Sequence, residues 1–227
     1  MKRKSGFPED LLFCAAPAND ASAEAPTAGP ASPGHPSSEE AILRAYLRIL
    51  GLKRLYRQGW LKRGVPESAC ESVADHSFGT AILALLVAGR PPFQDADPGK
   101  TCRMALAHEL GEVYAGDITP VDGISKEEKY RMERESLLRV LEGAPGCEEI
   151  LALWEEFEEG AGPEARLLRR LDRLEMGIQA AVYRAEGFDR MGEFLDSARK
   201  AVGEGYLGEV LARAVDSGRR PADGGRK

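Results

Sequence analysis

The chain has 227 residues, 43% of them hydrophobic, and carries a formal net charge of -6 at pH 7. This length suits one domain or two small ones, and we expect one because no linker interrupts the pattern after residue 38. The acidic balance argues against a general surface for nucleic-acid polymers or anionic membranes, which needs clustered Lys and Arg, whereas a small phosphorylated substrate needs only a few local cations.

Residues 1–38 are predicted to form a disordered tail. Residues 17–38 are rich in Pro, Ala, Ser and Gly and lack large apolar side chains, so they cannot bury enough surface to offset the entropy of ordering. We interpret His35 in this segment as a solvated side chain, with a regulatory or targeting arm as the functional alternative. Residues 218–227 are predicted to be a second flexible tail.

Helical periodicity begins at Ser37-x-x-Glu40, a capping-box pattern that predicts a first amphipathic helix with apolar residues continuing to Leu52. Residues 76–88 are apolar almost all round and predict a second, buried helix. Residues 98–115 predict a third helix that ends at Gly116.

Five further helices are predicted toward the carboxyl end. A charged helix runs from the capping box Ser125-x-x-Glu128 to Gly143, and the others cover residues 148–159, 164–185, 189–202 and 208–217. The long helix 164–185 is expected to turn a stripe from Leu167 to Val182 toward the core. Because no segment alternates convincingly with the period of a strand, we expect an all-α domain over residues 39–217.

The cysteines and the hydropathy pattern indicate a cellular compartment. The four cysteines are widely separated and form no Cys-x-x-Cys pair, as is typical of a reducing cytosol; they are Cys14, Cys70, Cys102 and Cys147. No apolar run approaches the ~18 residues of a membrane span, and a secretory signal is not expected at the start. We therefore expect a cytoplasmic protein that does not engage a membrane.

His108 and Glu109 stand side by side in the otherwise apolar segment of residues 103–114. Burying an imidazole and a carboxylate next to Leu106 and Leu110 is costly unless each finds a partner, and a divalent cation satisfies both. Four residues on, Glu112 is expected to share one helix face with His108. The segment is therefore interpreted as part of a metal site.

His76, in the second predicted helix, and Asp172, in the long one, could complete this site. Imidazole with carboxylate suits manganese, cobalt, magnesium, iron, nickel or zinc without any thiolate. Simpler interpretations exist for single residues: a hydrogen-bonded histidine, an ion pair of Asp172 with Arg169 or Arg173, and a solvated Glu112. Spacing alone leaves these alternatives open.

His76, the His108-Glu109 pair and Asp172 resemble, in order and rough spacing, the signature of HD-domain phosphohydrolases. More narrowly, residues 39–206 look like the HD-domain-containing protein 2 and YfbR-type 5'-deoxynucleotidases. Seven segments carry this likeness: residues 52–60, 71–76, 107–112, 116–120, 126–129, 153–158 and 171–176.

The resemblance implies an HD-domain helical bundle and an enzyme that removes phosphate from deoxyribonucleoside 5'-monophosphates, usually as a homodimer. It implies His76, His108, Glu109 and Asp172 as ligands of a divalent cation, and Glu112 and Asp117 as catalytic residues. Glu112, Asp117 and the carbonyl of Ile118 could also hold a second ion. The implied substrate-binding residues are Arg57, Trp60, Asp117, Ile118, Thr119 and Pro120, although Arg57 could be a surface cation and Trp60 a core anchor.

Glu109 departs from the family pattern, which has Asp at this position. One extra methylene moves the carboxylate outward by about 1.5 Å, which could lower activity or change metal preference unless the helix shifts or the binding becomes bidentate. Two alternatives to a deoxynucleotidase therefore stand: a phosphohydrolase acting on another nucleotide phosphoester, and a catalytically weakened protein that uses the fold for binding.

Overall fold

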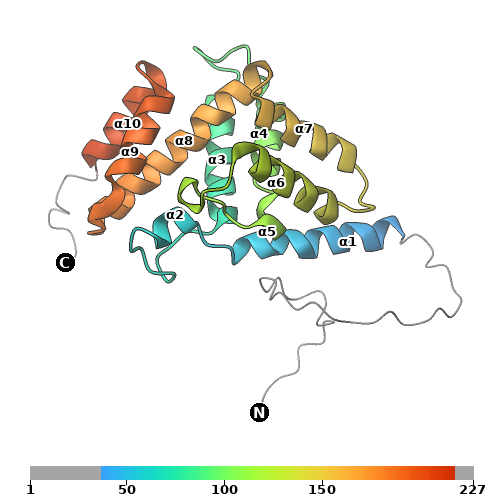
Figure 1. The fold of residues 1–227 in the computed structure, drawn as a ribbon. Coiled ribbons are helices and arrows are strands. Elements are labelled where there is room, and N and C mark those ends of the chain that lie inside the picture. The colour runs from blue at the N-terminus through green and yellow to red at the C-terminus, as the bar shows by residue number, and fades with distance from the viewer. Residues whose placement is uncertain (1–36, 218–227) are drawn as a thin grey trace, which may run out of the picture.

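Helices make up nearly all the regular structure of residues 37–217, the part of the chain that the computed structural model describes (Figure 1). The α-helices are α1 Ser38–Ile49, α2 Gln58–Leu61, α3 Val73–Val87, α4 Pro98–Ala107, α5 Glu112–Ala115, α6 Lys126–Val140, α7 Cys147–Glu159, α8 Gly162–Ala185, α9 Gly192–Val202 and α10 Tyr206–Ser217. Short 3-10 turns are η2 Leu50–Lys53, η3 Pro120–Asp122 and η4 Asp189–Met191.

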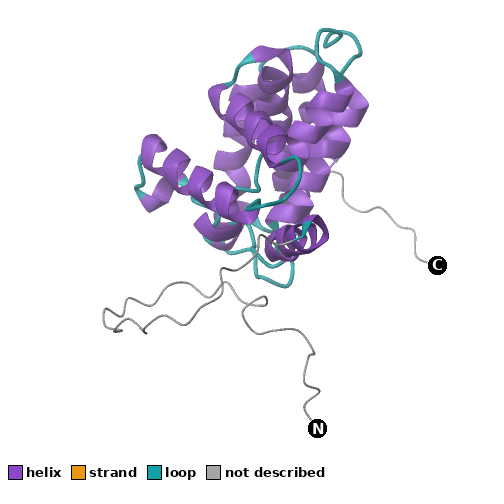
Figure 2. Ribbon diagram, turned by 90° about the vertical axis from the view of Figure 1, so that its right-hand side faces the viewer, coloured by secondary structure: helices purple, strands orange, loops and turns teal. Residues whose placement is uncertain are grey.

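The expected all-α class is confirmed. Between residues 37 and 217 there is no β-strand, only one isolated antiparallel bridge between Tyr56 and Ser72, and Figure 2 accordingly shows helices joined by loops. No helix within this range is long and apolar enough to cross a bilayer. Apart from Ser37 and Ser38, the two predicted tails lie outside the described residues.

Side-chain caps explain where several helices begin. The hydroxyls of Ser37 and Ser125 each accept a hydrogen bond from the backbone N–H three residues on, at 3.3 and 3.1 Å, and so start α1 and α6. Ser72 starts α3 with a reciprocal capping box to Asp75. This box fixes the first turn of α3, the turn that carries His76.

The long helix α8 is the spine of the fold, and it crosses the molecule diagonally in Figure 1. Helices α3, α4, α7, α9 and α10 all pack against it, and Leu168, Leu171 and Leu174 are fully buried there. Val182, which was predicted to face inward, is 43% exposed, so that part of the prediction is wrong. The buried stretch of α8 presents Asp172 and Glu175 to α3.

The predicted third helix is in fact two helices. Helix α4 ends at Ala107, residues 108–111 form a turn, and α5 begins at Glu112, so His108 and Glu112 do not share a helix face. Gly111 lets this turn pack against α6, because a Cβ there would lie 2.9 Å from both Cβ and the carbonyl oxygen of Glu133. Leu106, expected in the core, is 58% exposed.

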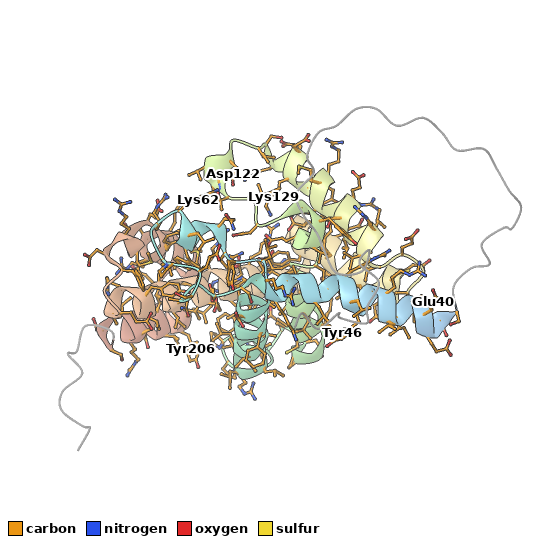
Figure 3. All side chains as sticks on the ribbon, turned by 90° about the horizontal axis from the view of Figure 1, so that it is seen from below. Glu40, Tyr46, Lys62, Asp122, Lys129 and Tyr206 are labelled. Carbon is orange, nitrogen blue, oxygen red and sulfur yellow. The ribbon has the colours of Figure 1, made fainter. Side chains whose placement is uncertain are left out.

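Helix α3 is not buried on all sides as predicted. Its inner face carries His76, Thr80 and Ala84, whereas Phe78 and Leu86 on its outer face are 65% and 61% exposed. Helix α1 behaves similarly, since it buries only the small residues Ala41 and Ala45 and exposes Ile42, Leu43 and Tyr46. Figure 3 labels Tyr46 on α1. Both helices thus carry more apolar surface than the fold covers.

Candidate metal centre

Two buried histidines each have one ring nitrogen engaged and one without a hydrogen-bond partner. Nδ1 of His76 lies 2.5 Å from Oε2 of Glu175, and Nδ1 of His108 lies 2.7 Å from the carbonyl oxygen of Ala105. Both Nε2 atoms are buried without a hydrogen-bond partner, and the ring centroids are 5.6 Å apart. A metal-binding imidazole uses its second nitrogen in this way, to fix the tautomer and the ring orientation.

Two carboxylates approach these free nitrogen atoms. Oε1 of Glu109 lies 3.7 Å from Nε2 of His76 and 3.5 Å from Nε2 of His108, and Oδ1 of Asp172 lies 3.1 Å from Nε2 of His76. Ligand atoms of His76, His108 and Glu109 all lie within 4.8 Å of one another. The structure thus brings the four predicted ligands together from α3, the turn after α4, and α8, and the orphaned nitrogen atoms beside oxygen donors fit a divalent cation.

The charges of the cluster depend on one another. Burial opposes a charge on His76, but Asp172 and Glu175 outweigh it and raise its pKa to about 10. Burial also opposes a charge on Glu109, but the cationic groups of His108, Arg57 and His76 lower its pKa to about 2. His76, with its raised pKa, thus compensates the carboxylates, whereas burial lowers the pKa of His108. Binding of a cation by His76 has to release its proton.

The carboxylate of Glu109 lies beside both histidines, even though its extra methylene, relative to the aspartate of the family pattern, changes where the carboxylate can sit. Glu109 follows the last residue of α4 by two positions and lies in the turn, where Nη1 of Arg57 is 3.3 Å from its Oε1. Oε1 of Glu109 thus faces three nitrogen groups at once.

Replacing Glu109 with Asp is expected to weaken divalent-cation binding, on the order of tenfold, and not to raise activity. The shorter side chain withdraws the carboxylate by about 1.5 Å from the three nitrogen groups, and displacements of ~1 Å are costly in such sites. Titration calorimetry with Mn²⁺ and initial rates of the two proteins measure both quantities. A variant that binds Mn²⁺ more tightly and turns over faster would contradict this use of the longer side chain.

Arg57 and Asp117 form the rim beside the cluster. Nη1 of Arg57, just before α2, lies 3.2 Å from Oδ1 of Asp117, and the backbone N–H of Gln58 donates to Oδ2 of the same carboxylate. Asp117 therefore fixes the start of α2 and points the guanidinium toward Glu109. The alternative that Arg57 is a surface cation is wrong, because only 14% of its side chain is exposed.

Glu112 is a buried acid with an unpartnered oxygen. It is 2% exposed, and its Oε2 has no hydrogen-bond partner. Burial, together with the negative charges of Glu109 and Asp117, raises its pKa well above the usual range. The simpler interpretation of Glu112 as a solvated carboxylate is therefore wrong.

A cavity of about 350 Å³ opens next to Asp117. Its walls are Leu55, Gln58, Lys62, Ala115, Gly116, Asp117, Ile118, Asp122 and Ile124. Across its rim the ammonium of Lys62 donates to Thr119 at 2.8 Å and to Asp122 at 2.7 Å, and Figure 3 shows Lys62 and Asp122 together, near Lys129. Of the predicted substrate-binding loop, Asp117 and Ile118 line the cavity, whereas Thr119 belongs to the rim and Pro120 is exposed.

Trp60 lies in the core and not at an open substrate surface. It is 1% exposed and packs against Tyr183 and Phe194 at centroid distances of 5.3 and 4.1 Å. Its indole N–H donates to Oε1 of Glu71 at 2.7 Å, so its one polar atom is already used. The predicted contact of Trp60 with substrate is therefore not supported, and its alternative reading as a core anchor fits this packing.

Glu175 and Glu71 lie beside His76 but are not among the predicted site residues. Glu175 follows Asp172 by three positions on α8, so it lies on the same face, and this spacing was an available signal. Glu71 precedes α3 and opens the segment 71–76 that carries the family likeness, but that likeness implied no role for it. Burial and the nearby charge of Glu175 raise the pKa of Glu71 to about 7.

Comparisons with known proteins find an HD-domain family model, 5'-deoxynucleotidases and a solved structure that are similar to this chain. The family model described as HD domain matches residues 50–207. The 5'-deoxynucleotidase HDDC2 of Danio rerio is 36% identical over 190 residues, which cover 80% of this chain and 91% of that protein. The enzyme of the same name from Mus musculus is 37% identical over 150 residues, covering 65% and 72%. The crystal structure of the PH0347 protein from Pyrococcus horikoshii aligns with a TM-score of 0.62 at 31% identity, covering 78% and 97%.

Proposed function

This chain belongs to the HD-domain family, and from that premise we propose that it is a metal-dependent 5'-deoxynucleotidase, which hydrolyses deoxyribonucleoside 5'-monophosphates to deoxyribonucleosides and phosphate. The observation that carries the proposal is the pair of unpartnered Nε2 atoms of His76 and His108, which converge on Glu109 beside Arg57. The relatives' printed names supply the substrate class.

In this proposal His76, His108, Glu109 and Asp172 hold the cation, which is manganese, cobalt, magnesium, iron, nickel or zinc. When bound, a divalent cation neutralises phosphoryl charge and lowers the pKa of water toward neutrality. Two imidazole nitrogen atoms and two carboxylates would suit such a divalent cation, because this ligand set needs no thiolate. The predicted second-ion role of Glu112, Asp117 and the Ile118 carbonyl stays part of the proposal, and counting the bound ions tests it.

Arg57 binds and orients the phosphate. Its guanidinium is buried, charged and held in place by Asp117 and Glu109, so little side-chain entropy is lost when a phosphoryl oxygen binds. Phosphate-monoester hydrolysis is among the slowest uncatalysed reactions, and preorganised positive charge supplies much of the required acceleration.

Glu112 moves the proton, because its carboxyl group is buried and unpartnered, and burial with the charges of Glu109 and Asp117 raises its pKa well above the usual range. It can deliver this proton to the 5' oxygen of the leaving deoxyribonucleoside, or accept one from the attacking water as a carboxylate. Asp117 and Ile118 then face the nucleoside, since both line the adjoining 350 Å³ cavity, which Leu55 and Ile124 make partly apolar.

Two alternatives remain within the family: another nucleotide phosphoester as substrate, or a weakened enzyme that only binds. A panel of deoxyribonucleoside and ribonucleoside monophosphates, a cyclic nucleotide and an alarmone nucleotide, assayed for product release, separates these. Preferential release of phosphate from dAMP, dCMP or dTMP supports the proposal. Turnover of only the cyclic or alarmone compound supports the first alternative, and metal binding without turnover supports the second.

We also propose a homodimer located in the cytoplasm. The exposed apolar faces of α1 and α3 support self-association, because soluble monomers rarely leave residues such as Phe78, Leu86 and Tyr46 open together. Among the described residues Cys70, Cys102 and Cys147 are free thiols, which agrees with a reducing compartment. The catalytic unit in this proposal is residues 39–217.

Leu86→Glu is expected to convert the dimer to a monomer without unfolding it. The side chain is 61% exposed in the single chain, so the glutamate is solvated in the monomer, but the dimer loses about 1.5–3 kcal/mol of apolar burial per protomer and gains a buried charge. Analytical ultracentrifugation measures the mass. Val182→Glu, on α8 and also partly exposed, is the matched control and should leave the mass unchanged. An unaltered dimer in Leu86→Glu would rule out this face.

A further inference from the structure

Polar groups extend from His76 away from the cation ligands and into the core. Nδ1 of His76 lies 2.5 Å from Oε2 of Glu175, and ligand atoms of Glu71, His76 and Glu175 all lie within 4.8 Å of one another. Glu71 in turn accepts the indole N–H of Trp60 at 2.7 Å, and its backbone N–H donates to the hydroxyl of Tyr183 at 2.8 Å. These contacts join the first turn of α3, α8 and α2.

Gly79 makes room for this arrangement. It stands three residues after His76 on α3, and a Cβ there would lie 2.8 Å from Oε1 and 3.1 Å from Cγ of Glu175. A glycine inside a helix costs stability relative to alanine, and α3 otherwise consists largely of good helix-forming and apolar residues. A side chain at position 79 would therefore force the carboxylate of Glu175 to shift from its place beside His76.

Glu71, His76 and Glu175 do not form a second ion site. A cation between two ligands keeps each about 2.0–2.2 Å away, which separates the ligand atoms by more than the 2.5 Å observed between Nδ1 and Oε2. The short contact is that of a hydrogen bond donated by the imidazole to a carboxylate.

We propose that Glu175 is a positioning residue for the metal centre: it fixes the ring of His76 so that Nε2 faces Glu109 and Asp172, while Glu71 and Trp60 hold the far side of the network. This inference rests on the proposed metal site but not on the identity of the substrate. It also gives Trp60 a role in the core in place of the predicted contact with phosphate.

Direct binding of Mn²⁺ to the purified chain, measured by titration calorimetry, tests the proposal independently of turnover. Glu175→Ala should weaken binding by about 10–100-fold, and Glu175→Gln, which keeps an acceptor oxygen, should weaken it less. Glu164→Gln is the matched control, because Glu164 is another buried glutamate of α8 that contacts Asp97 and Lys100 instead. Equal affinity in wild type and both Glu175 variants would overturn the proposal, whereas a wild type that binds no ion would overturn the proposed function.

Gly79→Ala tests the same point without touching a polar group. It should weaken Mn²⁺ binding like Glu175→Ala although alanine favours the helix, and the double variant Gly79→Ala/Glu175→Ala should bind no more weakly than Glu175→Ala alone. Full affinity in Gly79→Ala, or losses that multiply in the double variant, would contradict the packing argument. Circular dichroism establishes that each variant is folded.

Trp60→Phe keeps the ring but removes the N–H that binds Glu71. If Trp60 acts through the network, Mn²⁺ affinity falls, in the same direction as for Glu175→Gln, and KM for dAMP changes little at saturating metal. A raised KM with unchanged Mn²⁺ affinity would overturn this role and restore the predicted contact with substrate.

Discussion

His108→Ala is expected to abolish tight binding of a divalent cation and to lower kcat/KM by on the order of 10³, the scale of losing a main electrostatic stabiliser of the transition state. Nε2 of His108 is buried, has no hydrogen-bond partner and lies 3.5 Å from Glu109, so no nearby side chain replaces it. The remaining ligands, His76, Glu109 and Asp172, still form a cluster, but with an incomplete set.

A stability measurement tests His108→Ala without any assay of activity. Wild type should gain about 2.7 kcal/mol of unfolding free energy when Mn²⁺ is present at one hundred times its Kd, because the folded state binds the ion. The variant should gain almost nothing at the same concentration. His35→Ala removes the histidine predicted to be solvated and serves as the control. An equal gain in His108→Ala and wild type would show that His108 is not a ligand.

Glu112→Gln is expected to lower kcat by about 10²–10⁴, the usual contribution of a general acid or base, while KM and Mn²⁺ affinity change little. Glutamine fills the same volume but cannot give up or accept a proton at the reacting oxygen. The buried position of Glu112 and its unpartnered oxygen suit a neutral group, so the substitution should not unfold the protein.

The losses of kcat and of bound Mn²⁺ in Glu112→Gln together show whether Glu112 carries a proton or binds a second ion. Steady-state rates with dAMP, together with Mn²⁺ titration of the same samples, distinguish a proton carrier from a ligand of a second ion. A second-ion ligand would lose an equivalent of bound metal, and a proton carrier would not. Glu164→Gln controls for the loss of a buried carboxylate elsewhere. Unchanged kcat in Glu112→Gln would contradict both roles.

Much of the fold follows from local signals. The capping residues Ser37 and Ser125 and the three-and-four spacing of α8 place these helices within a few residues of where they occur. The break between α4 and α5 does not follow, because Leu106, Leu110 and Val113 keep a helical spacing across it. The turn depends on the close approach of Gly111 to Glu133 on α6. Such a contact between distant segments leaves no periodic trace.

For the site too, some features could be predicted from the sequence and others could not. Resemblance placed His76, His108, Glu109 and Asp172 in one cluster, and the structure brings them together from three separate segments. The partners of polar groups could not be read from the sequence, since they depend on packing between α2, α3 and α8. The resemblance implies a substrate contact for Trp60, with a core anchor as the alternative, and its N–H binds Glu71. No role is predicted for Glu175, which binds His76.

Phosphate release from dAMP, dCMP and dTMP can be measured on the purified chain after chelation and again after adding Mn²⁺ or Co²⁺. When the bound metal is counted in the same sample, this experiment tests directly whether the protein is a metal-dependent 5'-deoxynucleotidase. The proposed function predicts negligible release from the chelated protein, and activity that returns in step with the binding of metal to the site of His76 and His108. A protein that binds no divalent ion and releases no phosphate from any of the three nucleotides would contradict it.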